Sequence, residues 1–227
     1  VYSLQMHGHE QLYSHFPETR GLSWMHPFFG GIHPLLLPHG VNCYEGFLHR
    51  AASTAAPLEA VDRWGLRWTG VRVSARSDQE QLRAMLVELD VLTVGRAPVL
   101  KVVQRLVNER DGARQVVSGL TVTPSLGAPI KDLTLMGEGY WHRNSLIGNM
   151  RLAQQWGALV NPVDGRTALL VSNRKAVGLW ATAQVARLFW GGVDVQLAAR
   201  ETYETTYYLV LADSLEQAKR YLILQGA

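Results

Sequence analysis

Cysteine is nearly absent from this sequence: Cys43 is the only one among 227 residues. A disulfide within the chain is therefore excluded, and exported and internal locations both stay open. No apolar run is long enough to cross a membrane, and no signal peptide is recognisable. The net charge is +3 and no cluster of Lys and Arg stands out. We therefore expect a soluble protein of unspecified location, with neither nucleic acid nor membrane as partner.

The composition is that of an ordinary globular protein, with 47% apolar and 18% charged residues. We expect a single β-sandwich domain over residues 1–227, in which residues 1–60 form an irregular leading segment with short edge strands. The first residue is Val1 rather than Met, so we expect a processed chain or a piece of a longer protein. The leading segment holds most of the histidines and many prolines: His7, His9, His15, His26, His33, His39, His49, Pro17, Pro27, Pro34, Pro38 and Pro57.

Two β-branched runs, residues 98–108 and 114–123, carry the clearest strand signal. Asp111 and Gly112 lie between them, and an Asp-Gly pair readily adopts the left-handed dihedrals of a tight hairpin turn. The first run is apolar on both of its faces, which favours a strand inside a large sheet rather than at its edge. These residues predict a β-hairpin whose first arm is internal.

The remaining chain alternates short apolar runs with turn signals, and it ends with a strand over about residues 202–211. Asp213 is placed to cap a short helix, with Glu216 in the capping-box position. Roughly a dozen short, closely spaced strands favour antiparallel sheets over a parallel sheet with crossover helices. We therefore predict an all-β fold, a large antiparallel β-sandwich (supersandwich) with a short C-terminal helix.

Three stretches carry a family resemblance: LKVVQRLVNERDGARQVVSGLTVTPSLG, HPFFGGIHPLL and VDVQLAARETYETTYYLVLADSLEQAKRYL. Their order is similar to that of the galactose mutarotase-like β-supersandwich superfamily. This fold occurs in aldose 1-epimerases and in accessory domains of glycoside hydrolases and polysaccharide lyases. The resemblance implies a saccharide ligand and another domain or subunit of a carbohydrate-active protein as possible partners.

The resemblance also implies where epimerase chemistry would lie. Active family members use a His acid near the ring oxygen and a Glu base near the anomeric hydroxyl. Their His motif lies on the returning strand, where this sequence reads Leu120-Thr-Val-Thr-Pro124 and has no histidine. Glu201 falls roughly where the closing strand of the family begins. The resemblance therefore implies a sugar-associated sandwich that departs from the epimerase pattern.

Two groups of residues are candidates for binding a saccharide. His26 and His33 lie in the leading segment, where neutral imidazoles could hydrogen-bond hydroxyl groups or pack in loops. Tyr140, Trp141, His142 and Arg143 lie in a looser stretch, in which an indole face suits a pyranose ring and the polar groups suit its hydroxyls. The same Trp141 could instead plug the end of the sandwich.

The weak catalytic candidates are His39, Glu45, His142 and Glu201. A His and a Glu that face one pocket could act as acid and base, although the segment around Glu45 also reads as a surface loop. No histidine spacing matches a zinc signature, so we expect neither a metal nor a cofactor. The sequence leaves three functions open: a carbohydrate-binding domain, an aldose 1-epimerase-type enzyme and a purely structural or interaction domain.

Overall fold

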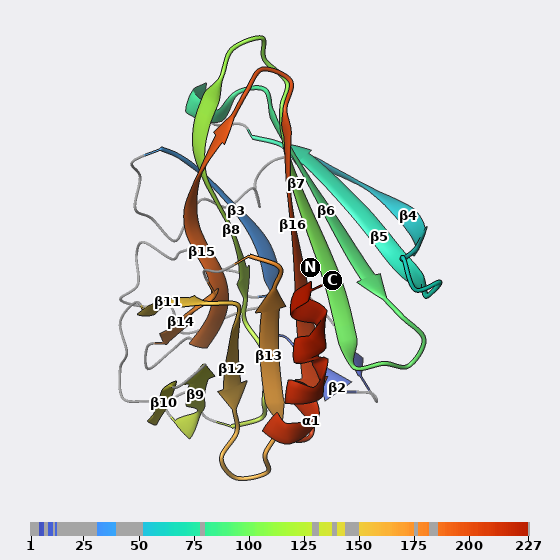
Figure 1. The fold of residues 1–227 in the computed structure, drawn as a ribbon, viewed down its shortest axis with the longest axis vertical. Helices are drawn as coiled ribbons and strands as arrows, with labels where there is room; N and C mark the ends of the chain where they lie inside the picture. Colours follow the sequence, from blue (N-terminus) through green and yellow to red (C-terminus); the bar gives the residue numbers. More distant parts are fainter. Residues whose placement is uncertain are drawn as a thin grey trace. The chain divides into compact units, whose positions relative to one another are not determined.

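The structure, a computed structural model, describes residues 5–6, 9–10, 12, 31–39, 52–77, 80–128, 132–137, 140–143, 150–174, 177–181 and 186–226. Its strands form antiparallel sheets, and a short helix follows the last strand (Figure 1). The predicted all-β sandwich with a C-terminal helix is therefore confirmed. No helix among the described residues is long and apolar enough to cross a membrane.

The chain divides into two compact units, and each contains segments that lie far apart in the sequence. The first unit comprises Val1–His33, Leu120–Gly191 and Val210–Ala227. The second unit comprises Pro34–Gly119 and Gly192–Leu209.

The larger sheet of the second unit has the strand order β4-β5-β6-β7-β16. The registers from β4 to β7 are regular and antiparallel, with Val71 opposite both Pro57 and Val91, and Val91 opposite Val102. The strand over 98–108 is β7, between β6 and β16, so its predicted internal position is confirmed. The strands are β4 (Ser53–Val61), β5 (Arg67–Arg76), β6 (Met85–Thr93), β7 (Val99–Asn108) and β16 (Thr202–Ala212).

The smaller sheet of this unit has the strand order β15-β8-β3. It packs face to face with the larger sheet, because alternate side chains of both sheets bury a shared apolar cluster. The short 3₁₀ turn Glu80–Leu82 contributes Leu82 to the same cluster. The strands are β3 (Ile32–Pro38), β8 (Arg114–Val122) and β15 (Ala186–Leu197). The cluster contains Leu36, Leu82, Met85, Val87, Leu106, Val116, Val195 and Leu197.

The predicted hairpin between the two β-branched runs is wrong. The strand β7 belongs to the larger sheet and β8 to the smaller one, so the intervening residues cross between the sheets. Neither Asp111 nor Gly112 has a positive φ, so the left-handed turn that this pair allows is not formed. The turn residues permit a hairpin, but the burial of Leu106 and Val116 between two sheets decides the topology.

Prolines of the leading segment lie in strands at the ends of the sheet orders. Pro34 and Pro38 belong to β3, the last strand of the smaller sheet, and Pro57 belongs to β4, the last strand of the larger sheet. Proline lacks the N–H that a central strand needs for its second neighbour. The structure therefore confirms edge strands within 31–39 and 52–60.

In the first unit, two sheet portions have the orders β10-β9-β12-β13 and β11-β14-β15, beside a small β1-β2 pair. The C-terminal helix α1 contacts β13. The strands of the first unit are β1 (Gln5–Met6), β2 (His9–Glu10), β9 (Thr134–Gly137), β10 (Tyr140–Arg143), β11 (Met150–Gln154), β12 (Trp156–Val160), β13 (Thr167–Ser172) and β14 (Val177–Ala181).

The helix α1 (Leu215–Lys219) has a different cap from the one predicted. Ser214, not Asp213, is the N-cap, and its hydroxyl accepts a hydrogen bond from the backbone N–H of Gln217 at 3.2 Å. The Gln217 Oε1 in turn accepts from the Asp213 N–H at 3.3 Å. Gln217 therefore takes the reciprocal role expected of Glu216, because Ser214 is three residues before it. A 3₁₀ segment, Arg220–Gly226, continues the chain.

Candidate functional site

His39 and Asp194 form a polar pair in the second unit. His39 directly follows β3, and Asp194 lies on β15 beside the buried core residue Val195. The His39 Nδ1 is 2.8 Å from the Asp194 Oδ1, and both side chains are about half exposed, at 50% and 56%. Because side chains alternate along β15, Asp194 lies on the face opposite the core. The pair fixes the imidazole by one nitrogen and leaves Nε2 for another partner.

Glu201, another catalytic candidate, has a role within its own turn. Its carboxylate accepts a hydrogen bond from the Ala198 N–H at 2.5 Å, and its backbone carbonyl accepts from Asn108 N–H at 3.0 Å. Arg200 within this turn has φ 62, a left-handed conformation that side chains seldom adopt. Glu201 therefore stabilises the turn before β16.

The other predicted site residues are not brought to this pair by the described structure. His33 is a buried β3 residue, only 6% exposed, which offers little surface to a ligand. Residues Tyr140–Arg143 form a strand, β10, paired with β9, where we expected a looser stretch. The side chains of these four residues, His142 included, lie outside the described part. His26 and Glu45 lie outside the described residues entirely.

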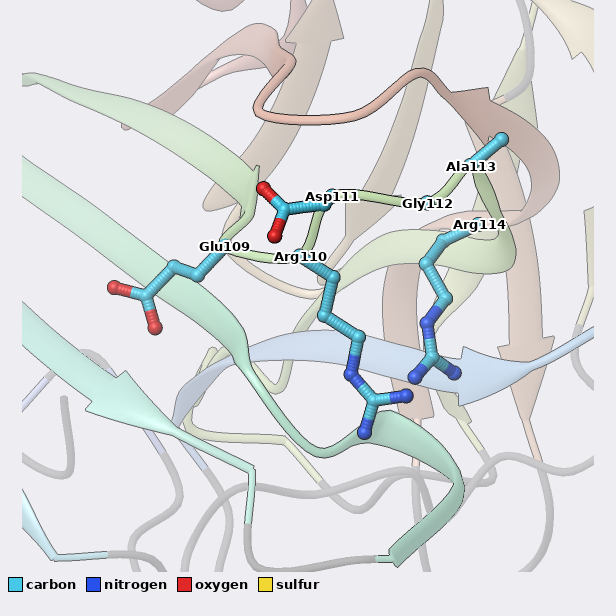
Figure 2. Close-up of a pocket in the computed structure, with 6 residues that line it drawn as sticks. All are labelled: Glu109, Arg110, Asp111, Gly112, Ala113 and Arg114. Atoms are coloured by element: carbon cyan, nitrogen blue, oxygen red, sulfur yellow. The ribbon is translucent and has the colours of Figure 1, made fainter.

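The connection between β7 and β8 forms a shallow hollow at one end of the second unit, lined by Glu109, Arg110, Asp111, Gly112, Ala113 and Arg114 (Figure 2). The fully buried Asn108 fixes its backbone. The Asn108 Nδ2 donates to the carbonyls of Gly112 and Ala198, each at 2.8 Å, and its Oδ1 accepts from Arg110 N–H at 3.2 Å. We call residues 109–114 the crossing loop.

Both carboxylates of the crossing loop are bound by arginines from outside it. Arg76 makes two hydrogen bonds to Glu109, at 2.9 and 2.8 Å, and Arg200 makes two to Asp111, at 3.0 and 2.8 Å. The bonds from Arg76 hold the pKa of the Glu109 carboxyl below its usual value, against the opposing effect of burial. The loop is thus fixed to β5 by one ion pair and to the turn before β16 by the other.

The crossing loop and Asp194 were missed as site residues. The tract Glu109–Arg114 has four charged side chains, but its Asp-Gly pair was interpreted only as a turn signal. Asp194 carried no local signal, since its partner His39 lies 155 positions away in the sequence. Only the proximity of the β3 end to β15 brings the two side chains together.

Two tryptophans near the β4–β5 connection, Trp64 and Trp68, contact charged side chains. The buried Trp68 donates from Nε1 to Asp62 Oδ2 at 3.0 Å, and the Lys101 Nζ lies 5.5 Å from the centre of its ring. Trp64 is 54% exposed, with the Arg63 guanidinium carbon 4.4 Å from its ring centre. No three His, Cys, Asp or Glu side chains in the described part of the chain gather closely enough to hold a metal ion.

Comparison with solved structures finds the same fold in sugar-processing proteins. A protein assigned as an aldose 1-epimerase from Klebsiella pneumoniae matches 92% of this chain and 70% of its own, with a TM-score of 0.67 and 10% identity. A galactose mutarotase related enzyme from Lactobacillus acidophilus matches 95% of this chain and 92% of its own, with a TM-score of 0.58 and 11% identity.

A third similar structure is a domain-sized part of a larger enzyme, the GH36 alpha-galactosidase AgaB from Geobacillus stearothermophilus. It matches 80% of this chain with a TM-score of 0.55 and 13% identity, and the match spans only 32% of the galactosidase. No protein-family model matches the sequence, and no curated protein matches it in sequence. The chain has the galactose mutarotase-like fold that the sequence resemblance implied.

Proposed function

We propose that this chain is a carbohydrate-binding β-sandwich domain, and that His39 and Asp194 hydrogen-bond a saccharide. The observation that carries the proposal is this half-exposed pair on a fold shared with sugar-processing proteins. A neutral imidazole whose Nδ1–H donates to a carboxylate can accept a hydrogen bond from a hydroxyl group at Nε2, and a protonated one can donate a hydrogen bond there. Sugar hydroxyls both donate and accept, so either state of His39 suits them.

The match to one part of the galactosidase supports a place for this chain within a larger sugar-processing protein. In such a protein the domain would form part of a subsite, and another domain or subunit would carry the bond-breaking groups. The exposed position of Asp194 fits this role, because a second surface can approach the pair from the side away from the core.

An aldose 1-epimerase is the second candidate, since a His–carboxylate pair is a frequent acid/base unit. Ring opening requires an acid at the ring oxygen and a base at the anomeric hydroxyl at the same time. His39 and Asp194 are bonded to each other, so they present one oriented imidazole rather than two independent groups. This favours binding over epimerisation.

Calorimetry and saturation-transfer NMR with neutral and acidic sugars test the proposal. We expect binding that weakens about tenfold in both His39→Ala and Asp194→Asn, the loss of roughly one hydrogen bond to the ligand. Arg67→Ala is the control, since Arg67 is 72% exposed and its contact with Glu59 is 3.7 Å long.

Absence of binding across the sugars would overturn the proposal and leave a structural or interaction domain. Polarimetry on freshly dissolved glucose and galactose tests the second candidate, the aldose 1-epimerase. Acceleration over buffer that disappears in His39→Ala would establish an epimerase instead of a binding domain.

A further inference from the structure

We propose that the crossing loop is an oxyanion site, which receives the carboxylate or phosphate group of an acidic saccharide through Arg110 and Arg114. The choice of a saccharide rests on the proposed function, whereas the anion site itself rests on the loop. Figure 2 shows both guanidinium groups pointing the same way, while the carboxylates of Glu109 and Asp111 point to another side.

The loop keeps its own acids away from these two cations. Glu109 is bound by Arg76 and Asp111 by Arg200, each through two hydrogen bonds, so neither carboxylate neutralises Arg110 or Arg114. Each of these ion pairs is close to neutral overall. The two remaining arginines therefore add two positive charges that the loop does not balance.

The guanidinium of Arg110 has all of its N–H donors available for a ligand. Its guanidinium makes no hydrogen bond or ion pair within the described part of the chain, whereas its backbone N–H is bound by Asn108 Oδ1. Arg114 donates one N–H to the carbonyl of Gln81 at 2.8 Å, which fixes the guanidinium and leaves its other donors. An oxyanion accepts such donors in pairs, with charge-assisted strength.

The backbone under the two arginines is held before any ligand arrives. The Asn108 carboxamide joins it to the turn before β16, and Arg200 N–H donates to the Arg110 carbonyl at 3.2 Å. Glu109 N–H donates to the Ala84 carbonyl at 3.0 Å, which connects the loop to the residue directly before β6. A loop fixed at both sides loses little conformational entropy on binding.

The charged side chains described near Arg110 and Arg114 do not occupy the proposed oxyanion site. Glu80 is the charged residue of the adjoining 3₁₀ turn, and Arg83 follows that turn, where its backbone N–H donates to the Glu80 carbonyl at 3.2 Å. The Glu80 carboxylate, the one described acid of that turn, forms no ion pair with Arg110 or Arg114. Within the described part of the chain, an incoming anion therefore meets two arginines without having to displace an acid.

Titrations of the intact chain with matched ligands test the proposal. The probes are glucose, glucuronate, glucose 6-phosphate and inorganic phosphate. Calorimetry at low and at high salt measures the affinity of each. We expect at least about tenfold tighter binding of one acidic sugar than of glucose, reduced by salt and by Arg110→Gln to the level of glucose. Arg110→Lys should lose most of the gain because it lacks the planar fork.

Arg67→Gln removes the same charge from an exposed site on β5 and should leave the preference intact. Glucuronate and glucose 6-phosphate distinguish a carboxylate from a phosphate ligand. Equal affinity for acidic and neutral sugars, or an Arg110→Gln variant with unchanged affinity, would overturn the site. Binding of inorganic phosphate through Arg110 without binding of any sugar would support the anion site and refute the carbohydrate function.

Discussion

Asp90 on β6 accepts two hydrogen bonds from the guanidinium of Arg72 on β5, at 2.6 and 2.9 Å, and the two residues are direct cross-strand partners. Arg105 on β7 adds a third bond to Asp90 at 2.5 Å and reaches Glu204 at 2.7 Å. The Asp90 side chain is only 3% exposed. This network joins neighbouring strands on the face of the larger sheet away from the core.

We expect Asp90→Asn to lower the free energy of unfolding by about 3 kcal/mol, because it leaves two guanidinium groups without their buried counter-charge. Arg72 is 36% exposed, which limits the loss through solvation. Urea denaturation at neutral pH measures the change. Glu59→Gln is the control: its exposed contact with Arg67, 3.7 Å long, should contribute almost nothing.

The same substitution should alter the pH dependence of stability. Burial alone raises the pKa of the Asp90 carboxyl, but the hydrogen bonds from Arg72 and Arg105 outweigh it and hold the pKa below its ordinary value. The stabilisation is therefore present above about pH 4, the pKa of an unfolded Asp, and is lost as the pH falls through the folded value. The stability gap between parent and Asp90→Asn should close in acid. A gap that stays constant below pH 4 would contradict this assignment.

Gly70 of β5 lies against the backbone of the neighbouring strand. A Cβ added there would overlap the Val91 carbonyl, so the two strands would have to separate. We expect Gly70→Ala to cost about 1–3 kcal/mol, as overpacking of a close-packed site does. Gly112→Ala is the matched control, because Gly112 is exposed and a Cβ there meets nothing within 4 Å. That control should stay within about 0.5 kcal/mol of the parent in urea denaturation.

Asn108→Ala should lower stability by about 1–3 kcal/mol, since a buried carboxamide with three hydrogen bonds is lost. Hydrogen exchange of the Arg110 N–H should accelerate, because this group is bound by Asn108 Oδ1. Gln115→Ala, an exposed change on β8, provides the comparison. Unchanged exchange at Arg110 would show that the carboxamide does not hold the crossing loop.

Ser214→Ala should cost about 1 kcal/mol, the usual contribution of a serine N-cap. Gln217→Ala should cost more than Glu216→Ala, because Gln217 provides the reciprocal hydrogen bond and Glu216 only an exposed contact with Lys219 at 3.4 Å. Thermal denaturation of the three variants decides between the two caps. The reverse order of Gln217 and Glu216 would restore the cap predicted from the sequence.

The sequence predicted strands well because alternation is a local property. The internal position of β7 followed from apolar residues on both of its faces, and the edge positions of β3 and β4 followed from their prolines. The partner of β7 could not be predicted in the same way. A turn signal says that the chain can reverse, but packing between two sheets decides whether the next strand joins the same one.

The candidate site was less predictable for a related reason. His39 was a candidate by residue type, but its partner Asp194 is a single carboxylate in an ordinary strand. Arg110 and Arg114 were not candidates, because the sequence does not show that Glu109 and Asp111 are bound by arginines from other segments. Such pairings depend on distant segments, and local patterns carry no information about them.

The second unit is assembled from two stretches separated by 72 residues of the first, Leu120–Gly191. During synthesis, residues 34–119 leave the ribosome well before Val195 and Leu197 of their shared core. Until then the apolar side chains of the early strands stay exposed to solvent, and such a state is prone to aggregation. We infer that this unit completes its folding only after Val195 and Leu197 have been synthesised, and that fragments ending before Gly192 do not form its core.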